Sequence, residues 1–268
     1  MNRFRKIPLI SVFVGLTLSI LSYTNNPAIS APTLGQSHMF LPVISFDCSA
    51  AEIDSNFAYN ACGWQARRGE WTVDNDTYST NGIREQWSTT TYDGHFANLD
   101  YRARMKRTGC EFCANQLLIR GEPDPLKRDG TWHNAYAFQF NRDGNFSVWI
   151  SVDGSPYLPL QRWAFSPAIR QGYAWNELRV VAVNRLLLFY INDEQVWSGL
   201  GDARSESQVG IGMYRDADSS GNQLVVDWAT LARLPDPGIP DGIHTSELTL
   251  SSQINFDEAA DGRLLSGE

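Results

Sequence analysis

Short segments in which apolar and polar residues alternate are the feature that most limits how this chain can fold. The clearest covers residues 99–107, where every second residue is apolar and the residues between are charged: Leu99, Tyr101, Ala103 and Met105 alternate with Asp100, Arg102, Arg104 and Lys106. A β-strand places successive side chains on opposite faces, so this pattern predicts a strand with one buried face. No helical period is sustained, and only residues 167–171 could form a short helical turn. We therefore expect an all-β protein.

Turn residues separate the predicted strands. Residues 135–141 and 145–152 flank Arg142-Asp143-Gly144, in which glycine suits the positive φ of a tight hairpin turn. Many short strands joined in this way are typical of a two-sheet sandwich or a jelly roll. The segment 186–191 is apolar throughout, so we expect that strand to be covered on both faces.

The first 31 residues have the pattern of a secretory signal peptide. Three cations, Arg3, Arg5 and Lys6, precede an uncharged apolar run over residues 7–23, and small residues follow where a peptidase could cut after Ser30 or Ala31. The alternative is an uncleaved anchor, although a run of about 17 residues is at the short limit for crossing a bilayer. We expect a secreted protein, in the extracellular space or at the cell surface, with no membrane span after signal removal.

The composition divides the remaining chain into three parts. Residues 32–44 form a polar spacer, residues 45–234 carry the strand pattern, and residues 235–268 form an acidic tail that begins with a Pro/Gly-rich linker. This last part is either a tail or the start of a further domain. The sequence thus predicts a single folded domain over residues 45–234.

The charge of the chain excludes one class of partner. Its 268 residues contain 22 Lys and Arg against 30 Asp and Glu, a formal net charge of -8. Proteins that bind duplex nucleic acid place a basic surface against the phosphates. We therefore expect no nucleic-acid partner.

Four cysteines indicate disulfides if the protein is exported. Cys48, Cys62, Cys110 and Cys113 allow three pairings, and we favour Cys48–Cys62 with Cys110–Cys113 because both close short loops. Pairing between the two sets stays open. The Cys110-x-x-Cys113 spacing also occurs in zinc and redox motifs, but the chain offers neither a second tight pair nor a βαβ context.

Several strand and turn segments resemble a known superfamily. The chain resembles the concanavalin A-like jelly rolls over about residues 46–234. Within that superfamily it most resembles the bacterial laminin-G-like and 3-keto-disaccharide hydrolase-type domains. Five segments carry the resemblance: 175–182, 188–193, 196–199, 209–213 and 225–229. Asp193 stands where the family usually has a turn glycine, and aspartate tolerates that conformation. The resemblance implies an all-β, two-sheet antiparallel jelly-roll sandwich. It implies little about activity, because the shared residues form strands and turns.

No catalytic motif is complete. The catalytic glycosidases of this superfamily, the laminarinase and lichenase type, share a Glu-x-Asp-x-x-Glu strand. This strand places two carboxylates about 5 Å apart, as retaining hydrolysis requires. Here Glu52-Ile53-Asp54 is followed by Phe57, and Glu122-Pro123-Asp124 by Lys127. No Gly-x-Ser-x-Gly motif supports a serine triad. We expect a non-enzymatic protein more than an enzyme.

One loop has the spacing of a calcium site. Asp216, Asp218 and Ser220 precede Gly221, and Asp227 occupies the twelfth position. The flanking segments are predicted strands and not the helices of an EF-hand, so an acidic hairpin turn is the alternative. Calcium is the one candidate cofactor.

Cationic and aromatic residues suggest a ligand site. Arg102 and Arg104 share the polar face of one strand, and Trp149 lies on the polar face of another, with Arg120 and Trp132 in neighbouring segments. If these faces lined one concave sheet, the tryptophan would stack on a sugar while the cations bound its hydroxyls. The alternative is a solvated sheet face with Trp149 under a loop.

These patterns predict an exported, non-catalytic binding or adhesion module for carbohydrate, such as a cell-surface glycan. A glycoside-cleaving enzyme of the 3-keto-disaccharide hydrolase type is the first alternative. A structural spacer domain of a surface protein is the second.

Overall fold

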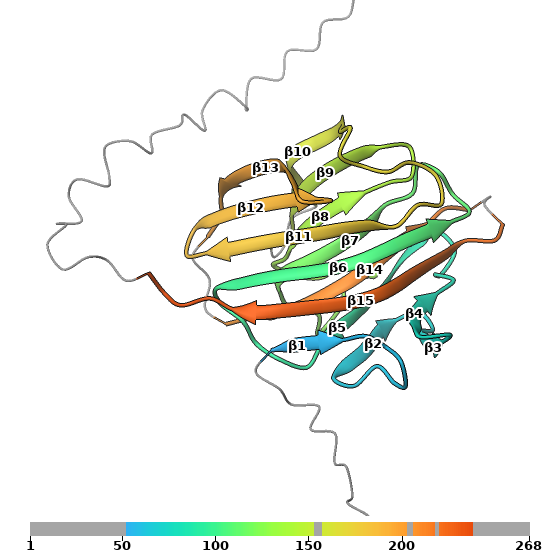
Figure 1. Cartoon of the computed structure of the whole chain (residues 1–268), viewed down its shortest axis with the longest axis horizontal. Coiled ribbons are helices and arrows are strands. Elements are labelled where there is room, and N and C mark those ends of the chain that lie inside the picture. The colour runs from blue at the N-terminus through green and yellow to red at the C-terminus, as the bar shows by residue number, and fades with distance from the viewer. Residues whose placement is uncertain (1–51, 153–156, 203–205, 218–219, 238–268) are drawn as a thin grey trace, which may run out of the picture. The chain divides into compact units, whose positions relative to one another are not determined.

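The chain folds into two facing layers of antiparallel strands (Figure 1). The computed structural model describes residues 52–152, 157–202, 206–217 and 220–237, and none of these is helical. This part of the chain accordingly contains no helix long and apolar enough to cross a membrane. The predicted signal peptide, the spacer and all but the first residues of the tail lie outside the described residues.

The first layer, here the β6 sheet, has eight strands among the described residues. Seven follow one path, and β1 (Ile53–Ser55) pairs with β15 beside it. The path runs through β13 (Glu194–Leu200), β12 (Leu186–Ile191), β11 (Asn176–Val183), β6 (Leu99–Thr108), β15 (Gln223–Arg233), β4 (Thr77–Thr80) and β3 (Thr72–Asp74).

The second layer, here the β7 sheet, has seven strands among the described residues. Within this sheet β14 lies between β7 and β5, and both of these strands are far from β14 in the sequence. The order is β10 (Leu158–Phe165), β9 (Asn145–Ile150), β8 (Tyr136–Phe140), β7 (Asn115–Gly121), β14 (Gln208–Arg215), β5 (Gln86–Tyr92) and β2 (Trp64–Arg68).

One apolar core fills the space between the sheets. The predicted alternation of residues 99–107 is confirmed, because β6 has alternately buried and half-buried residues along its whole length. Phe138 of the β7 sheet stacks on Phe189 of the β6 sheet with ring centroids 4.3 Å apart. Both side chains are at most 1% exposed. The burial of such large apolar side chains is the main force that holds the two layers together.

Two strands differ from the sequence expectation. The prediction that residues 186–191 are covered on both faces is wrong: β12 buries Leu187, Phe189 and Ile191 against the core, while Leu186 is 43% exposed. In contrast, all seven residues of β7 are buried. A strand is buried on both faces only where something covers its outer side, so the outer face of the β7 sheet is covered near β7.

The predicted Cys110–Cys113 disulfide is confirmed, with Cα atoms 5.5 Å apart. Cys62 is also disulfide-bonded. Its predicted partner, Cys48, lies outside the described residues. The Cys110–Cys113 bond closes the connection between β6 and β7 at one end of the sandwich.

Candidate functional site

A row of outward-facing polar residues crosses the β7 sheet. Leu117 and Ile119 of β7 belong to the core, so the residues that alternate with them face outward. The strand register aligns five outward positions from β5 to β9: Thr89, Gly212, Gln116, Gln139 and Ser147. The four side chains in this row are each at most 5% exposed.

Hydrogen bonds connect most of this row. Trp149 Nε1 donates to Ser147 Oγ at 2.8 Å, and the Ser147 hydroxyl donates to Gln139 Oε1 at 3.2 Å. Gln139 Nε2 in turn donates to Gln116 Oε1 at 3.0 Å. Gln116 Nε2 and Thr89 Oγ1, however, have no hydrogen-bond partner among the residues that the structure describes. Buried polar groups are nearly always hydrogen-bonded, so these two atoms are exceptions within the row.

Gly212 leaves the space between the side chains of Gln116 and Thr89 free of side chain. A Cβ atom at this position would lie 3.0 Å from Gln116 Nε2 and 3.0 Å from Thr89 Cγ2. The glycine therefore leaves room above β14 for the Gln116 amide and the Thr89 methyl group.

A cavity of about 430 Å³ opens beside this row. It combines apolar ring surfaces with hydrogen-bonding groups, which is the composition of small-molecule sites. Seven residues from the sheet and its connections line it: Trp87, Lys127, Asp129, Thr131, Gln139, Trp149 and Tyr157.

The loop between β7 and β8, here the strap loop (residues 122–134), covers the sheet and forms one wall of the cavity. Its Asp129 carbonyl accepts a hydrogen bond from the Trp87 N–H of β5 at 3.1 Å. Lys127 Nζ donates to Ser151 Oγ, just past β9, at 2.6 Å. Gly130 lies so close to β2 that a Cβ atom there would be 2.6 Å from Arg68 Cδ. The loop is thus fixed to both sides of the sheet.

Trp132 anchors the strap loop near its C-terminal end. Its side chain is 0% exposed and belongs to a small apolar cluster on the outer face of the sheet, against which Trp149 packs. The indole lies directly over β14 and the end of β7, because a Cβ atom at Gly210 or Gly121 would be 2.6 Å or 2.4 Å from it. This cluster explains why β7 is buried on both faces.

Charge and burial act together on the Tyr157 side of the cavity. Burial, and then the nearby Asp129 carboxylate, raise the pKa of the Tyr157 hydroxyl well above its usual value. The Lys127 ammonium lies 5.7 Å from the centroid of the same ring. Asp129 Oδ1 accepts hydrogen bonds from the N–H and the hydroxyl of Thr131. Tyr157 therefore stays a neutral hydroxyl at physiological pH.

Of the five predicted ligand residues, the structure places one in this cavity, Trp149. Trp132 is a strap-loop residue whose side chain packs against the outer face of the sheet. Arg120 is 1% exposed, and its guanidinium donates to the carbonyls of Asp202 and Asn184, both at 2.6 Å. Arg120 therefore holds loops together at the end of the sheet.

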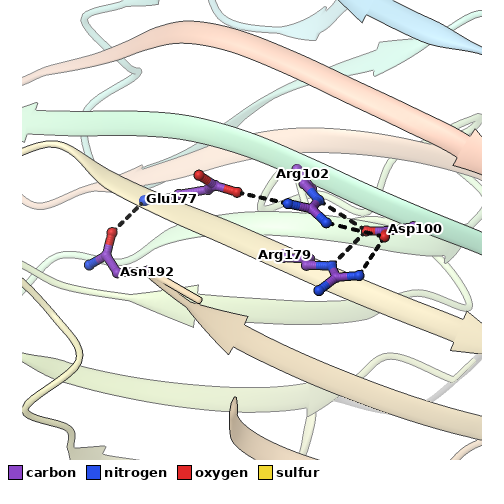
Figure 2. A network of polar contacts seen from close by, with 5 residues as sticks. All are labelled: Asp100, Arg102, Glu177, Arg179 and Asn192. Carbon is purple, nitrogen blue, oxygen red and sulfur yellow. Dashed lines mark hydrogen bonds and ion pairs between the residues drawn. The ribbon is translucent and has the colours of Figure 1, made fainter. Parts of the chain in front are cut away.

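The two remaining predicted residues lie on the other layer. Arg102 and Arg104 belong to β6, and β9 with Trp149 belongs to the β7 sheet, so the groove expected from the sequence does not form. Figure 2 shows Arg102 between the carboxylates of Asp100 and Glu177, at 3.3 Å and 3.4 Å. Arg104 pairs with Asp227 at 2.8 Å. These cations are occupied by carboxylates of their own sheet.

Asp100 is the centre of that network, because Arg179 also binds it at 2.6 Å (Figure 2). Burial alone would raise the pKa of Asp100, but hydrogen bonds from Arg179 and Arg102 and the charges of these residues outweigh burial. The pKa of the carboxyl therefore lies below its usual value.

The calcium prediction stays a prediction. Asp216 and Ser220 lie in the connection between β14 and β15, and Asp218 is outside the described residues. The Asp216 carboxylate lies within 4.8 Å of the sulfurs of Cys110 and Cys113. Those sulfurs are bonded to each other and are not metal ligands in this state.

Sequence reasoning missed most of the cavity. Gln139 is the one amide in the apolar β8, and Gln116 lies in β7 beside a run of three apolar residues. Buried amides in such surroundings are a usable signal of a ligand site. Trp87, Tyr157 and the strap-loop residues gave no comparable signal, since only the fold brings them together.

Solved structures share the fold at low sequence identity. The Emp47p carbohydrate recognition domain matches with a TM-score of 0.53 at 6% identity, over 68% of this chain and 95% of that chain. The β-glucanase of Bacillus licheniformis matches with a TM-score of 0.52 at 8% identity, over 69% and 99%. A native glycosidic hydrolase gives 0.52 at 9% identity, over 70% and 99%.

No protein-family profile and no curated protein matches the chain. The structural matches confirm the predicted two-sheet jelly-roll fold. These matches include a carbohydrate recognition domain as well as hydrolases. The fold alone therefore does not distinguish a binding protein from an enzyme, and the residues of the site must do so.

Proposed function

We propose that the chain is a non-catalytic carbohydrate-binding module whose site is the cavity under the strap loop. The observation that carries this proposal is that aromatic rings and an amide line one cavity: Trp87, Trp149 and Tyr157 supply the rings, and Gln139 supplies the amide. Sugars present C–H faces that pack on aromatic rings and hydroxyls that bond to amides. The cavity offers both kinds of surface side by side.

The carboxylates favour binding over hydrolysis. Glycoside hydrolysis in this type of site uses two carboxyl groups, and among the described residues that line the cavity Asp129 is the only one. A second cavity of about 610 Å³ contains Glu122, Asp124 and Glu206. There Glu122 accepts a hydrogen bond from Asn134, and Glu206 pairs with Arg233. Two of these three carboxylates are therefore already engaged.

The signal-peptide pattern of the sequence supports the same function. The basic and apolar pattern of the first 31 residues is that of a signal peptide, and disulfides persist in oxidising compartments. We therefore propose that the module acts outside the cell or at its surface, where glycans are its partners.

A glycan array tests the proposal directly. The chain is expected to bind at least one neutral or acidic glycan, and Trp149→Ala is expected to weaken that binding at least tenfold, equivalent to about 1.4 kcal/mol. Trp175→Ala is the matched control, because Trp175 lies against Arg104 and Lys106 on the other sheet. Binding should survive in this control.

Two outcomes would contradict the proposal. Silence across the array would remove the binding function and favour a structural spacer. Release of product from glycosides or 3-keto-glycosides, lost on substitution of Asp129 or Glu122, would favour an enzyme instead.

A further inference from the structure

The Cys110–Cys113 disulfide lies against a carboxylate from a distant part of the chain. The two sulfurs and a carboxylate oxygen of Asp216 are within 4.8 Å of one another. The cysteines belong to the connection between β6 and β7, whereas Asp216 is the first residue after β14. The sequence showed only the pair of cysteines, and the fold adds a third side chain of a kind that binds metals.

Asn222 fixes these two segments to each other. Its Oδ1 accepts hydrogen bonds from the Cys110 N–H at 3.0 Å and from Arg107 Nη2 at 2.7 Å. A Cβ atom at Gly109 would lie 2.7 Å from Asn222 Cα, so the two backbones are in close contact there. The cysteines and Asp216 are therefore held near each other by the scaffold as well as by the S–S bond.

Once the disulfide is reduced, the three side chains are suitable ligands for zinc. Zn²⁺ binds thiolate sulfur at about 2.3 Å and carboxylate oxygen at about 2.0–2.2 Å, so ligand atoms around a tetrahedral ion lie about 3.6–3.8 Å apart. The three atoms already lie within 4.8 Å of one another. The Cys113 N–H donates to Cys110 Sγ at 3.1 Å, and a bond of this kind stabilises a thiolate. Three protein ligands leave the fourth position to a water.

The charge of the site is the same in the disulfide form and in a zinc-bound form. The disulfide is neutral, so Asp216 contributes the one negative charge of the three side chains. Two thiolates and the carboxylate carry three negative charges, and Zn²⁺ leaves one of them. The guanidinium of the buried Arg107 interacts electrostatically with the Asp216 carboxylate. Exchange between the two forms therefore leaves this arginine with the same net charge beside it.

From these ligands and the scaffold that holds them, we propose that the reduced chain binds one Zn²⁺ through Cys110, Cys113 and Asp216, and that disulfide formation releases it. None of the three residues lines the cavity under the strap loop. The inference therefore goes beyond glycan binding and does not rest on it.

The exchange balances with a thiol partner. A dithiol reductant becomes a disulfide while the Cys110–Cys113 bond breaks and each sulfur takes up one proton. Zn²⁺ then binds, and both protons leave. In the reverse direction a disulfide oxidant accepts two electrons from the sulfurs and two protons from solvent and becomes two thiols. The S–S bond of the protein forms again, and Zn²⁺ leaves without a change of oxidation state.

Cobalt titration of the full chain tests the site. The background is Cys48→Ser/Cys62→Ser, which leaves Cys110 and Cys113 as the cysteines of the chain. The protein is reduced with a phosphine, which is removed without oxygen before Co²⁺ is added in place of Zn²⁺. The reduced chain should bind one Co²⁺, with a thiolate-to-cobalt charge-transfer band and the visible bands of tetrahedral Co²⁺. The oxidised chain should show none of these bands.

Asp216→Asn separates this site from a simple pair of thiols. The variant should weaken Zn²⁺ binding to the reduced chain at least tenfold, since loss of even a residue that only orients a ligand costs about 10–100-fold. Asp227→Asn is the matched control and should keep the affinity, because that carboxylate pairs with Arg104 on the β6 sheet. Excess Ca²⁺ should not displace Co²⁺, because calcium takes oxygen ligands.

Several outcomes would overturn the inference. They are absence of cobalt bands in the reduced chain, equal binding by the oxidised chain, equal affinity in Asp216→Asn, and displacement by Ca²⁺. The circular dichroism spectrum is recorded with Zn²⁺ present, and a reduced chain that stays unfolded there also contradicts a site built on the scaffold.

Oxidation of the zinc-bound chain tests release. Oxidised glutathione is added, and a chromophoric indicator follows free Zn²⁺ while the remaining thiols are counted. One Zn²⁺ should appear for every two thiols that are lost. Thiols that disappear while Zn²⁺ stays bound would show that the disulfide and the metal do not compete for the same sulfurs.

Discussion

The outer faces of the two sheets differ in how their polar groups are satisfied. On the β6 sheet, Arg102, Arg104 and Arg179 each meet a carboxylate within the same face. On the β7 sheet, a row of hydroxyls and amides ends in Gln116 Nε2 and Thr89 Oγ1, which have no partner among the described residues. A face that pairs its own charges has little left to offer a ligand. On the β7 sheet, hydrogen-bonding side chains and aromatic rings line a cavity, and this is surface that a ligand can use.

The largest expected difference between the faces is in stability. Trp132→Ala should lower the free energy of unfolding by about 3–5 kcal/mol, because it leaves a cavity under the strap loop. Trp175→Ala, on the β6 sheet, should cost below about 1 kcal/mol. Denaturant unfolding of both variants measures the difference. Equal losses would show that the strap loop is not held by its tryptophan.

Gly212→Ala tests the unpaired groups without changing either of them. The new methyl group would lie 3.0 Å from Gln116 Nε2 and from Thr89 Cγ2, so one of the two side chains must shift. Gln116 is hydrogen-bonded to Gln139, which lines the cavity, so a shift of Gln116 is expected to lower glycan affinity about tenfold. The unfolding free energy should fall by about 1–3 kcal/mol. Unchanged affinity would place the ligand away from this row.

The charge network of the β6 sheet predicts a dependence on pH. Because the pKa of Asp100 is lower in the folded state, its stabilising contribution is present above its unfolded pKa of 3.8. That contribution is lost as the pH falls through the folded pKa. Wild-type stability should therefore decline in this acid range by up to about 1 kcal/mol more than that of Asp100→Asn.

Urea midpoints measured from pH 6 down to pH 3 follow this loss. Asp54→Asn, at an exposed position on β1, provides the matched carboxyl removal. If Asp100→Asn and the wild type lose stability in parallel, the network of Figure 2 contributes nothing in solution.

The smallest effect is expected for Arg104→Ala. Its side chain is 41% exposed and that of Asp227 is 31% exposed, and pairs of this kind contribute about 0–1 kcal/mol. Glycan affinity should not change, although the sequence pattern places Arg104 in the ligand site. A loss of binding in this variant would move the site to the β6 sheet and reverse the comparison.

The sequence predicted the fold better than the site for a physical reason. Alternation along residues 99–107 is a local property, and a strand with one buried face follows from it directly. Which strands share a sheet is a long-range property. The sequences around Arg104 and Trp149 do not indicate that the two residues lie in different sheets, Arg104 in the β6 sheet and Trp149 in the β7 sheet.

Residues 186–191 show the opposite error. Their apolar composition suggested burial on both faces, but Leu186 lies where no element of the described residues covers it fully. The residues of β7 are more polar and yet completely buried, because the strap loop carries Trp132 over them. Cover by a distant loop residue leaves no mark in the strand that is covered.

The two ends of the strap loop are joined to each other. Glu122 N–H donates to the His133 carbonyl at 3.0 Å, and His133 N–H donates to the Glu122 carbonyl at 3.1 Å. A segment that leaves and returns at one point can change length at small entropic cost to the scaffold. The strap loop can therefore gain or lose residues away from Trp132 and change the wall of the cavity, while the sheet beneath keeps its register.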